Sequence, residues 1–395
     1  MLQTSRIRLT TRITETSRLT DSMKSMVDPL LWESHFEACK RFIGAVGHII
    51  ALPLLTIVLG QSTSVLADYS VVIPSVETTS VSSTEDAADD PAIWIHPSNP
   101  ELSLILGTNK QKGLEVYNLE GARVQSLDIG NLNNVDLRQR IQWDGRVMDI
   151  AVATNRSTNS LSLFSIDRES GEVEHLTDES IVLDLPTPYG VCLFKSGSSL
   201  FAFVNDKNGT FEQWELKPDG ASRKARSFSV DSQPEGCVAD DETETLYYGE
   251  EEFGVWKRNA DPKLNSEATL VVSLSESALV ADVEGMAIYR TDEADGYLVV
   301  SSQGDSSFAV FELDGANPYI GSFRIGDSGE GGIDSVSGTD GIDITNASLS
   351  TEFPHGMLVV QDDENSMPQE NQNFKLIDWR RVSDQLMLGK SAVGD

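Results

Sequence analysis

A cluster of carboxylates lies in residues 234–252 of this 395-residue chain, within the stretch PEGCVADDETETLYYGEEE. Its acidic members are Glu235, Asp240, Asp241, Glu242, Glu244, Glu250, Glu251 and Glu252. Two like charges ~4 Å apart repel each other by about 4 kcal/mol at an effective dielectric constant of about 20. Carboxylates that converge must therefore take up protons or bind a hard cation, and a site made only of oxygen ligands favours Ca²⁺ over Zn²⁺.

Basic residues stand at one recurring place in the first half of the chain. Lys110, Arg156 and Lys207 each come directly after a strand-like hydrophobic run, whereas acidic residues occupy the corresponding places at 250–252 and 362–364. An arginine can grip a phosphate with two hydrogen bonds, and lysines act on it as point charges. This pattern predicts a site for a multiply charged anion, with cations on one side and metal-binding carboxylates on the other.

The elements that must position these residues are six repeats of about 50 residues, a period typical of propellers. The second strand expected in each repeat is LSLILGTNK (102–110), VMDIAVATNR (147–156), SLFAFVNDKN (199–208), ETLYYGEEE (244–252), GYLVVSSQGD (296–305) and GMLVVQDDEN (356–365). We predict an all-β, six-bladed β-propeller, with a pair of β-sandwiches as the alternative. We expect residues 69–78 to supply the missing edge strand of blade six, which closes the ring, and residues 380–388 to form a short helix.

Equivalent turns of all blades lie on one face of a propeller, around the central channel. We therefore expect four carboxylates from separate segments to converge there, namely Glu235, Glu251, Asp282 and Glu284. By contrast, Glu242 and Glu244 fall in the opposite hairpin and are expected to be solvated.

The N-terminal segment resembles a targeting sequence. A basic pair at residues 40–41 precedes the apolar run 42–60, and small residues follow as far as Asp68. We expect residues 1–67 to be an N-terminal extension and signal peptide and 68–395 to be the propeller domain. Cleavage there would give a secreted or periplasmic protein that is not associated with the membrane. The apolar run is also long enough for a membrane anchor, which is the alternative.

The net charge of −32 indicates a soluble chain that repels nucleic acid and anionic membranes. Two cysteines follow the expected signal segment, Cys192 and Cys237, and both stand in apolar strand-like runs. We expect buried free thiols there, with one disulfide as the alternative. The sequence contains no nucleophile-elbow, P-loop or zincin motif, and its five histidines are scattered.

Several motifs in one order over about residues 75–380 resemble the β-propeller phytases, also called alkaline phytases. These motifs are DDPAIWIHP, NLNNVDLR, TNR, EGCVADDE, ADVEGMAIY, SSQG, TDGID and NQNFK. The resemblance implies a 3-phytase-type phosphoric monoester hydrolase that acts on phytate (inositol hexakisphosphate) and other inositol phosphates. It also implies several structural and catalytic Ca²⁺ ions, two adjacent phosphate sites and no covalent intermediate. A monomer is expected.

Carried over by position, the resemblance also assigns roles to individual residues. The catalytic calcium ligands are Glu235, Glu251, Asp282 and Glu284. The phosphate ligands are Lys110, Arg156, Tyr189 and Lys207. The structural calcium ligands are Asp90, Val135 (through its carbonyl), Asp340, Glu77 and Asn371. One departure is Gln111, because family members often carry a second consecutive lysine there.

Two rival functions fit the same architecture. Calcium-dependent six-bladed lactonases and esterases hold a central metal but need no wall of three cations. A secreted propeller that only binds a ligand or partner is the non-enzymatic alternative.

Overall fold

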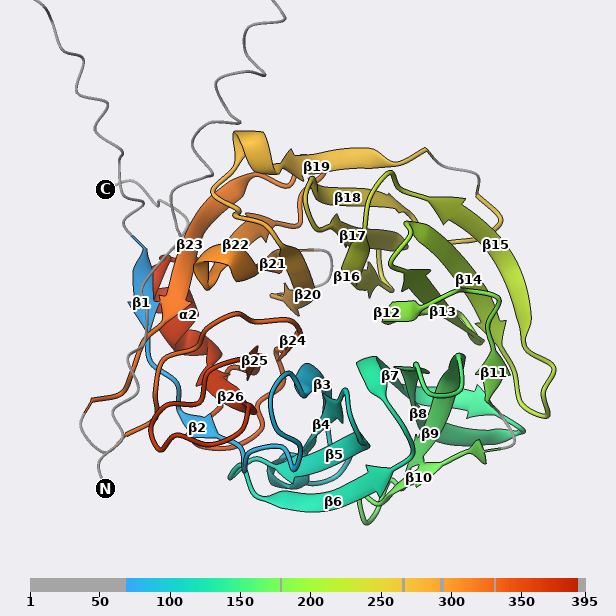
Figure 1. Ribbon diagram of the computed structural model, residues 1–395, viewed down its shortest axis with the longest axis horizontal. Helices are drawn as coiled ribbons and strands as arrows, with labels where there is room; N and C mark the ends of the chain where they lie inside the picture. Colours follow the sequence, from blue (N-terminus) through green and yellow to red (C-terminus); the bar gives the residue numbers. More distant parts are fainter. Residues whose placement is uncertain (1–68, 178–179, 265–266, 292–294, 330–331, 390–395) are drawn as a thin grey trace, which may run out of the picture. The chain divides into compact units, whose positions relative to one another are not determined.

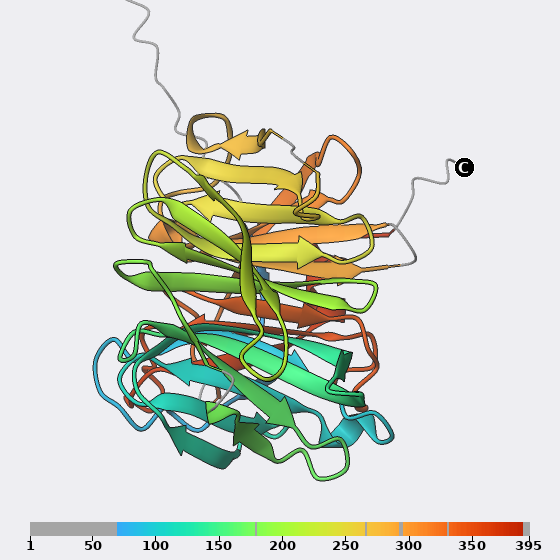
Figure 2. The ribbon, with the colours of Figure 1, turned by 90° about the vertical axis from the view of Figure 1, so that its right-hand side faces the viewer.

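The computed structural model describes the chain between residues 69 and 389, apart from 178–179, 265–266, 292–294 and 330–331. Six β-sheets surround one central axis (Figure 1), and a side view shows their strands running roughly alongside one another (Figure 2). The predicted all-β, six-bladed propeller is therefore confirmed. The predicted signal peptide, its apolar run and the cleavage site lie outside the described residues. Within the described part, no helix has the length and apolarity that crossing a bilayer requires.

Each blade begins with the strand nearest the axis, and its later strands lie progressively further out (Figure 1). Blade one contains β3 (Ala88–Trp94), β4 (Leu104–Asn109), β5 (Gly113–Asn118) and β6 (Arg123–Asp128). Blade two contains β7 (Leu132–Trp143), β8 (Arg146–Asn155), β9 (Ser160–Ile166) and β10 (Val173–His175), with β11 (Ile181–Val182) also paired to β9. Blade three contains β12 (Pro188–Ser196), β13 (Ser199–Asp206), β14 (Thr210–Leu216) and β15 (Arg223–Ser229).

The other three blades follow the same order. Blade four contains β16 (Pro234–Asp240), β17 (Thr245–Glu250), β18 (Gly254–Asn259) and β19 (Thr269–Ser273). Blade five contains β20 (Val283–Arg290), β21 (Gly296–Ser302), β22 (Ser307–Glu312) and β23 (Tyr319–Ile325). Blade six contains β24 (Ile342–Thr345), β25 (Met357–Asp362) and β26 (Asn373–Asp378). The helical elements are η1 (Pro100–Leu102), η3 (Leu274–Glu276), η4 (Gln303–Asp305) and α2 (Trp379–Gln385).

The N-terminal segment closes the ring, but it serves two blades instead of one. β2 (Val76–Glu77) pairs with β26 and completes blade six as predicted. β1 (Ser70–Val72) pairs in parallel with β23 and adds a fifth strand to blade five. The short helix α2 lies where it was predicted. Ser75 also donates its backbone N–H to the Leu376 carbonyl at 2.8 Å, so the segment between the two strands is tied down as well.

Packing between blades explains why the middle strands are hydrophobic along their whole length. All residues of β4 and β25 are buried, because each blade is packed between two neighbouring blades that together cover both faces of its middle strands. At the junction of blades three and four, Phe203 and Phe211 pack with Tyr248 in one buried cluster. These layers hold the inner strands at fixed positions around the channel.

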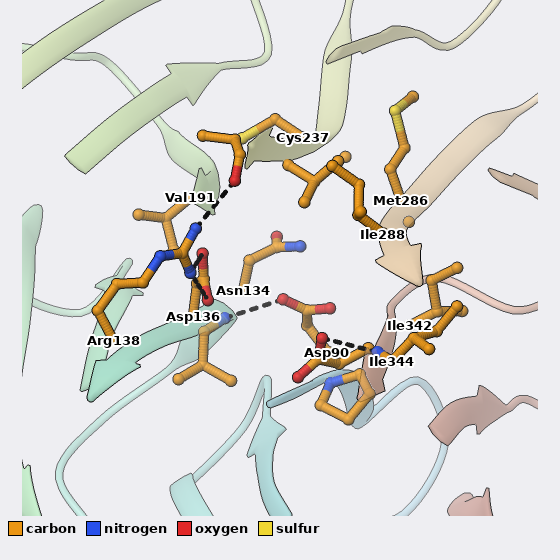
Figure 3. Close-up of a pocket in the computed structure, with 17 residues that line it drawn as sticks. Asp90, Asn134, Asp136, Arg138, Val191, Cys237, Met286, Ile288, Ile342 and Ile344 are labelled. Carbon is orange, nitrogen blue, oxygen red and sulfur yellow. Dashed lines mark hydrogen bonds and ion pairs between the residues drawn. The ribbon is translucent and has the colours of Figure 1, made fainter. Parts of the chain in front are cut away.

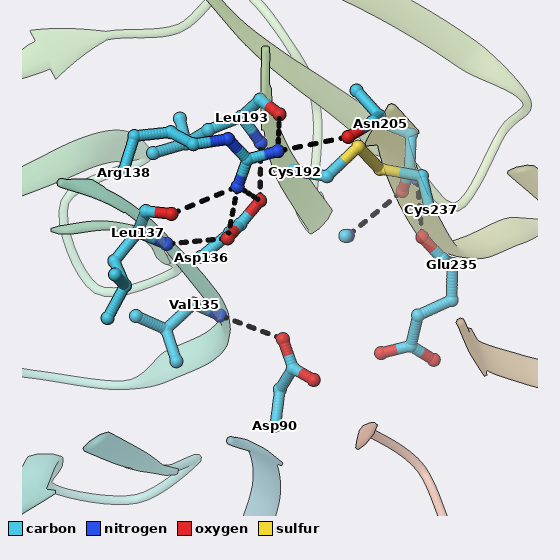
Figure 4. The surroundings of a disulfide bond; sticks show 12 residues. Asp90, Val135, Asp136, Leu137, Arg138, Cys192, Leu193, Asn205, Glu235 and Cys237 are labelled. Atoms are coloured by element: carbon cyan, nitrogen blue, oxygen red, sulfur yellow. Dashed lines mark hydrogen bonds and ion pairs between the residues drawn. A yellow bond between two sulfur atoms is a disulfide. The ribbon is translucent and has the colours of Figure 1, made fainter. Parts of the chain in front are cut away.

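The structure corrects the expectation of two buried free thiols. Cys192 of β12 and Cys237 of β16 form a disulfide, with their Cα atoms 5.8 Å apart (Figure 4). Each cysteine is in an apolar strand, as expected. What the sequence did not reveal is that the two strands are adjacent inner strands of neighbouring blades with both cysteines at the same level. The disulfide thus joins blades three and four beside the channel.

Truncation tests the role of the N-terminal strands. A protein that begins at residue 79 lacks β1 and β2, which leaves the outer edges of β23 and β26 unpaired. Open sheet edges invite aggregation. We expect a lower thermal midpoint and concentration-dependent light scattering relative to a protein that begins at residue 69. Equal midpoints and equal scattering would show that the ring does not depend on this closure.

Candidate active site

Three carboxylates meet at one mouth of the channel. Glu235 lies in β16, Glu251 directly follows β17, and Glu284 lies in β20. One carboxylate oxygen from each residue lies within 4.8 Å of the others. All three residues are buried. We call this group the acidic cluster. The structure thus brings together three of the four carboxylates that the sequence analysis placed at the axis.

Irregularities in the inner strands present these side chains. The pairing register shifts within β12, β16 and β20 at bulges that contain Tyr189, Glu235 and Glu284. A bulge locally re-aims side chains, and bulges often lie beside active sites. Gly236 follows Glu235, and a Cβ atom there would lie 2.1 Å from the Glu284 carbonyl oxygen. Glycine at this position therefore lets β16 and β20 approach closely enough for their glutamates to meet.

Hydrogen bonds satisfy only part of the acidic cluster. The Asn133 amide donates to Glu235 Oε1 at 2.8 Å, and the Gln233 amide donates to Glu251 Oε1 at 2.7 Å. The Tyr189 hydroxyl also hydrogen-bonds to the Glu235 carboxylate. Among the described residues nothing bonds to Glu284 Oε2, although this atom is buried. A proton or a cation is therefore required to satisfy the remaining carboxylate oxygens of the cluster.

Burial and mutual repulsion make these carboxyl groups weak acids. Burial, with the nearby Asp340 and Glu251 charges, raises the pKa of Glu235 from 4.5 to about 7. Burial, with the Asp282 and Asp340 charges, raises the pKa of Glu251 to about 7. The pKa of Glu284 is also raised, by burial and by its contact with Glu235. At neutral pH the cluster thus retains protons that a bound cation would replace.

A polar cavity of about 420 Å³ opens beside the cluster. Its lining residues are Asp86, Lys110, Tyr189, Gln233, Glu251, Asp282, Glu284, Gln303, Gly338, Asp340 and Asp363. Asp282, the fourth predicted carboxylate, is therefore a lining residue. Its backbone is fixed from both sides, because Gln303 donates its N–H to the Asp282 carbonyl at 3.0 Å and Val283 donates to the Glu251 carbonyl at 3.0 Å.

Lys110 lies inside an acidic network at the rim of this cavity. Its Nζ atom is 2.7 Å from Asp340 and 3.3 Å from Asp89, and it also contacts the largely exposed Asp86. Burial alone would lower the pKa of Lys110, but Asp89 and Asp340 raise it above its usual range. The lysine is therefore charged. Any anion that enters competes with these carboxylates for the ammonium group.

The other two predicted cations do not line the cavity, but each lies near a residue of the mouth, Lys207 near Tyr189 and Arg156 near Asp89. The exposed Lys207 ammonium lies 3.8 Å from the centroid of the Tyr189 ring, in a cation–π contact. Arg156 is half-buried, and its guanidinium has no ion-pair partner within the described ranges. Both groups remain available to an anionic ligand. Tyr189 connects this cationic side to the acidic cluster through its hydrogen bond to Glu235.

Gln111 points away from the cavity. Its side-chain amide donates to the Thr84 carbonyl at 2.7 Å and to the Asp86 carbonyl at 3.2 Å. The residue therefore fixes the segment that carries Asp86 against Lys110. In this chain the position serves loop structure and does not add a cation to the mouth.

The residues predicted to bind structural calcium fall into separate places. Asp90 and Val135 both line a second cavity of about 180 Å³ inside the channel, in which Figure 3 labels Asp90. The Val135 N–H donates to Asp90 Oδ2 at 3.0 Å (Figure 4). Asp340 belongs instead to the mouth, beside Lys110. Its neighbour Gly341 touches Asp90, since a Cβ atom there would lie 2.1 Å from the Asp90 carboxylate.

Glu77 and Asn371 lie in blade six and do not line either cavity. Glu77 accepts a bond from the fully buried Lys375 ammonium at 2.9 Å. Asp334 and Asp362 contact the same ammonium at 2.5 and 3.1 Å. The Asn371 amide donates to the Val81 carbonyl at 3.1 Å. A lysine thus provides the positive charge that balances Glu77 here.

Sequence reasoning missed Asp86, Asn133 and Gln233 at the mouth. Asn133 stands in the NLNNVDLR motif, and Gln233 directly precedes the PEGCVADD strand, so their proximity to quoted motifs was the available signal. Asp86 lies in a loop before the first repeat strand. Nothing in its neighbourhood indicated a contact with Lys110.

Comparison with known proteins identifies the family. The model of the family described as Phytase matches residues 40–393. The chain belongs to the phytase family. It is 41% identical over 327 residues to a protein named 3-phytase from Bacillus subtilis (strain 168), and the match covers 80% of this chain and 85% of that protein.

Similarity to solved structures is weaker. A protein of unknown function from Desulfotomaculum acetoxidans DSM 771 has a TM-score of 0.43 at 16% identity, covering 59% of this chain and 70% of that one. A chain of a nidogen/laminin complex has a TM-score of 0.42 at 13% identity, covering 64% and 83% respectively.

The raised pKa values of the acidic cluster predict how this phytase-family chain depends on pH without metal. Glu235 has a folded-state pKa of about 7 against 4.5 when unperturbed. The folded state then binds the Glu235 proton more tightly than the unfolded state does. The stabilisation that this proton provides is complete below pH 4.5 and is lost as pH rises through 7. In chelator, Glu235→Gln should therefore weaken the fall in the free energy of unfolding between pH 5 and 8. We expect a difference on the order of 1 to 3 kcal/mol.

Urea denaturation at several pH values measures this difference. Glu242→Gln is the matched control, because Glu242 is exposed in the opposite hairpin. If both variants keep the pH dependence of the unchanged protein, the protonation of Glu235 in the folded state does not contribute to stability.

Proposed function

We propose that this chain is a calcium-dependent phytase that releases phosphate from phytate by attack of a water molecule, without a covalent phosphoenzyme. Membership of the phytase family supports the reaction class. The observation that carries the calcium dependence is the acidic cluster, in which three buried carboxylates converge within 4.8 Å. Secretion to the periplasm or the exterior, after cleavage before Asp68, is part of the proposal.

The acidic cluster fits a hard cation both in the type of its ligand atoms and in its unsatisfied, proton-retaining carboxyl groups. All its potential ligand atoms are carboxylate oxygens, the ligand type that Ca²⁺ takes. Glu284 Oε2 is buried and has no partner in the described portion, and Glu235 and Glu251 have raised pKa values. In the proposal Glu235, Glu251, Asp282 and Glu284 hold the catalytic ions. When bound, calcium would neutralise phosphate oxygens and acidify a water molecule.

The cationic side would bind and orient the substrate. Arg156 and Lys207 lack carboxylate partners among the described residues and can contact phosphate groups directly. Burial and the Glu235 charge raise the pKa of Tyr189, so its hydroxyl remains protonated and can donate a hydrogen bond. Lys110 would have to exchange one carboxylate for a phosphate. Asp86 is the exchangeable partner, because 75% of its side chain is exposed.

Charge explains why the metal is needed for binding as well as for chemistry. The chain carries a net charge of −32, and phytate is a polyanion. The carboxylates at the mouth would repel phosphate groups unless protons or cations neutralised them. Protons cannot serve at alkaline pH. Calcium should therefore raise both substrate affinity and turnover.

Four glutamine substitutions test the proposed division of the acidic segment. Glu235→Gln and Glu251→Gln each remove one ligand charge while keeping the side-chain shape. We expect a loss of most phytate hydrolysis at moderate calcium, with partial recovery at high calcium. Glu242 and Glu244 lie in the hairpin on the opposite face; Glu242 is exposed as expected, whereas Glu244 is half-buried and accepts a hydrogen bond from the Ser196 hydroxyl at 3.2 Å. Glu242→Gln and Glu244→Gln should behave like the unchanged protein, because a glutamine oxygen can accept the same bond. Phosphate release against calcium concentration measures all four. An equal loss in all four would mean that the segment acts only through its overall field.

Arg156→Ala tests the cationic side. The change removes a charge-assisted contact to phosphate, so catalytic efficiency on phytate should fall by about tenfold, which corresponds to about 1.4 kcal/mol of transition-state stabilisation. Arg146→Ala is the matched control, since Arg146 is exposed at the other end of the same strand, β8. Circular dichroism checks that both variants fold. Near-normal kinetics for Arg156→Ala would assign this residue to the solvated surface.

A further inference from the structure

The inner strands of blades three and four are connected at two points beside the acidic cluster. β12 and β16 bulge at the same level, and the bulges contain Tyr189–Gly190 and Glu235–Gly236. The two backbones touch there, because a Cβ atom on Gly190 would lie 2.0 Å from the Glu235 carbonyl oxygen. Any movement of one bulge therefore displaces the other.

Asn205 provides the first connection. It is fully buried near the end of β13, the second strand of blade three. Its side-chain oxygen accepts the Gly190 N–H at 2.9 Å, and its amide donates to the Glu235 carbonyl at 2.8 Å. One side chain thus bonds to the bulge that presents Tyr189 and to the bulge that presents Glu235. Both bonds go to backbone, so Asn205 fixes the positions of these groups without touching the cavity.

The disulfide provides the second connection. Cys192 lies two residues after Gly190 in β12, and Cys237 directly follows Gly236 in β16 (Figure 4). The bond joins β12 to β16 covalently, next to the point where Asn205 joins them by hydrogen bonds. Across the ranges that the structure describes, no other pair of blades is joined by a disulfide.

The corresponding position in blade two makes the same kind of connection to the next blade. Thr154 occupies it, and its hydroxyl donates to the Tyr189 carbonyl at 2.6 Å while accepting the Asn134 N–H at 3.2 Å. Blade four has Gly249 there, which leaves room for the Val283 carbonyl and the Met286 side chain. Polar connections from this position therefore run from blade two to blade four, are interrupted at Gly249, and recur in blade five, where the Ser301 hydroxyl donates to the Thr339 carbonyl at 2.8 Å. The connection made by Asn205 is the one that reaches Glu235 of the acidic cluster.

We propose that Asn205 and the Cys192–Cys237 disulfide form a two-point clamp that positions Tyr189 and Glu235 and thereby sets the calcium affinity of the acidic cluster. This inference rests on the proposed function. Its physical reason is crowding, because carboxylate oxygens of Glu235, Glu251 and Glu284 converge within 4.8 Å and exert a force that separates their strands when no cation lies between them. The clamp holds β16 against this force, so less reorganisation accompanies metal binding. Asn205 and the cysteines are positioning residues, since none of them lines the cavity at the mouth.

Calorimetric titration of Ca²⁺ into metal-depleted protein tests the clamp. Removal of an outer residue that orients a metal ligand commonly weakens metal affinity by about tenfold or more, and we expect this for Asn205→Ala. The Cys192→Ser/Cys237→Ser double variant should also bind calcium more weakly than the unchanged protein. In both variants, the calcium concentration that gives half-maximal phytate hydrolysis should rise. The maximal rate at saturating calcium should change by a smaller factor.

Asn317→Ala is the matched control. Asn317 is also a buried asparagine whose amide donates to a backbone carbonyl, that of Glu312 at 3.0 Å, but it lies away from the mouth. Asn317→Ala should lower the thermal midpoint and leave calcium affinity unchanged. If Asn205→Ala had only a general effect on stability, it would give the same result. All titrations are made well below the lowest midpoint. If Asn205→Ala does not fold, the cysteine double variant alone decides the question.

The possible outcomes separate this inference from the function on which it rests. Calcium affinity that falls in the clamp variants but not in Asn317→Ala supports the clamp. Unchanged affinity in the clamp variants overturns the clamp and leaves the proposed function intact. If the unchanged protein neither binds calcium nor needs it for phosphate release, the proposed function and the clamp are both overturned.

Discussion

The repulsion among buried carboxylates at the mouth of the channel governs the rest of this structure. Glu235, Glu251 and Glu284 present oxygens within 4.8 Å of one another, in a site where burial already disfavours charge. Folding brings these groups together only because packing between blades and the bulged inner strands force them inward. A cation that replaces their protons relieves the repulsion. In our account the same cation prepares the mouth for a polyanion.

The two sides of the mouth depend on each other through Tyr189. Its ring lies under the Lys207 ammonium, and its hydroxyl bonds to Glu235. Its carbonyl accepts a bond from Thr154 of the preceding blade. Groups that would bind phosphate and groups that would bind metal are thus fixed by one connected set of bonds. Because the set spans blades two to four, the geometry of the site depends on how neighbouring blades pack.

The repeat pattern predicted the propeller because every blade is built from the same meander, and six copies leave little choice of topology. It also predicted which turns share a face, and hence that Glu235, Glu251 and Glu284 would meet. Features that depend on contacts between blades were not predictable. The Cys192–Cys237 disulfide and the division of residues 69–78 between two blades are of this kind, since periodicity within a blade carries no information about its neighbour.

Individual side-chain partners were the least predictable part of the site. Lys110 was expected to face substrate, but it lies among Asp86, Asp89 and Asp340, which come from loops and strands far apart in the chain. Gln111 occupies the place of a family lysine, yet it bonds to two backbone carbonyls of a loop. Such contacts follow from the three-dimensional closure of the ring and have no local pattern in the sequence.

Crystallography with calcium tests the central claim most directly. Crystals of the protein grown with Ca²⁺ and without phytate should show anomalous density for at least one ion between Glu235, Glu251 and Glu284, in oxygen-only coordination. Chelation should remove this density while the three glutamates stay close together. Density for water alone at this point, in crystals where calcium is bound elsewhere or not at all, would contradict the account.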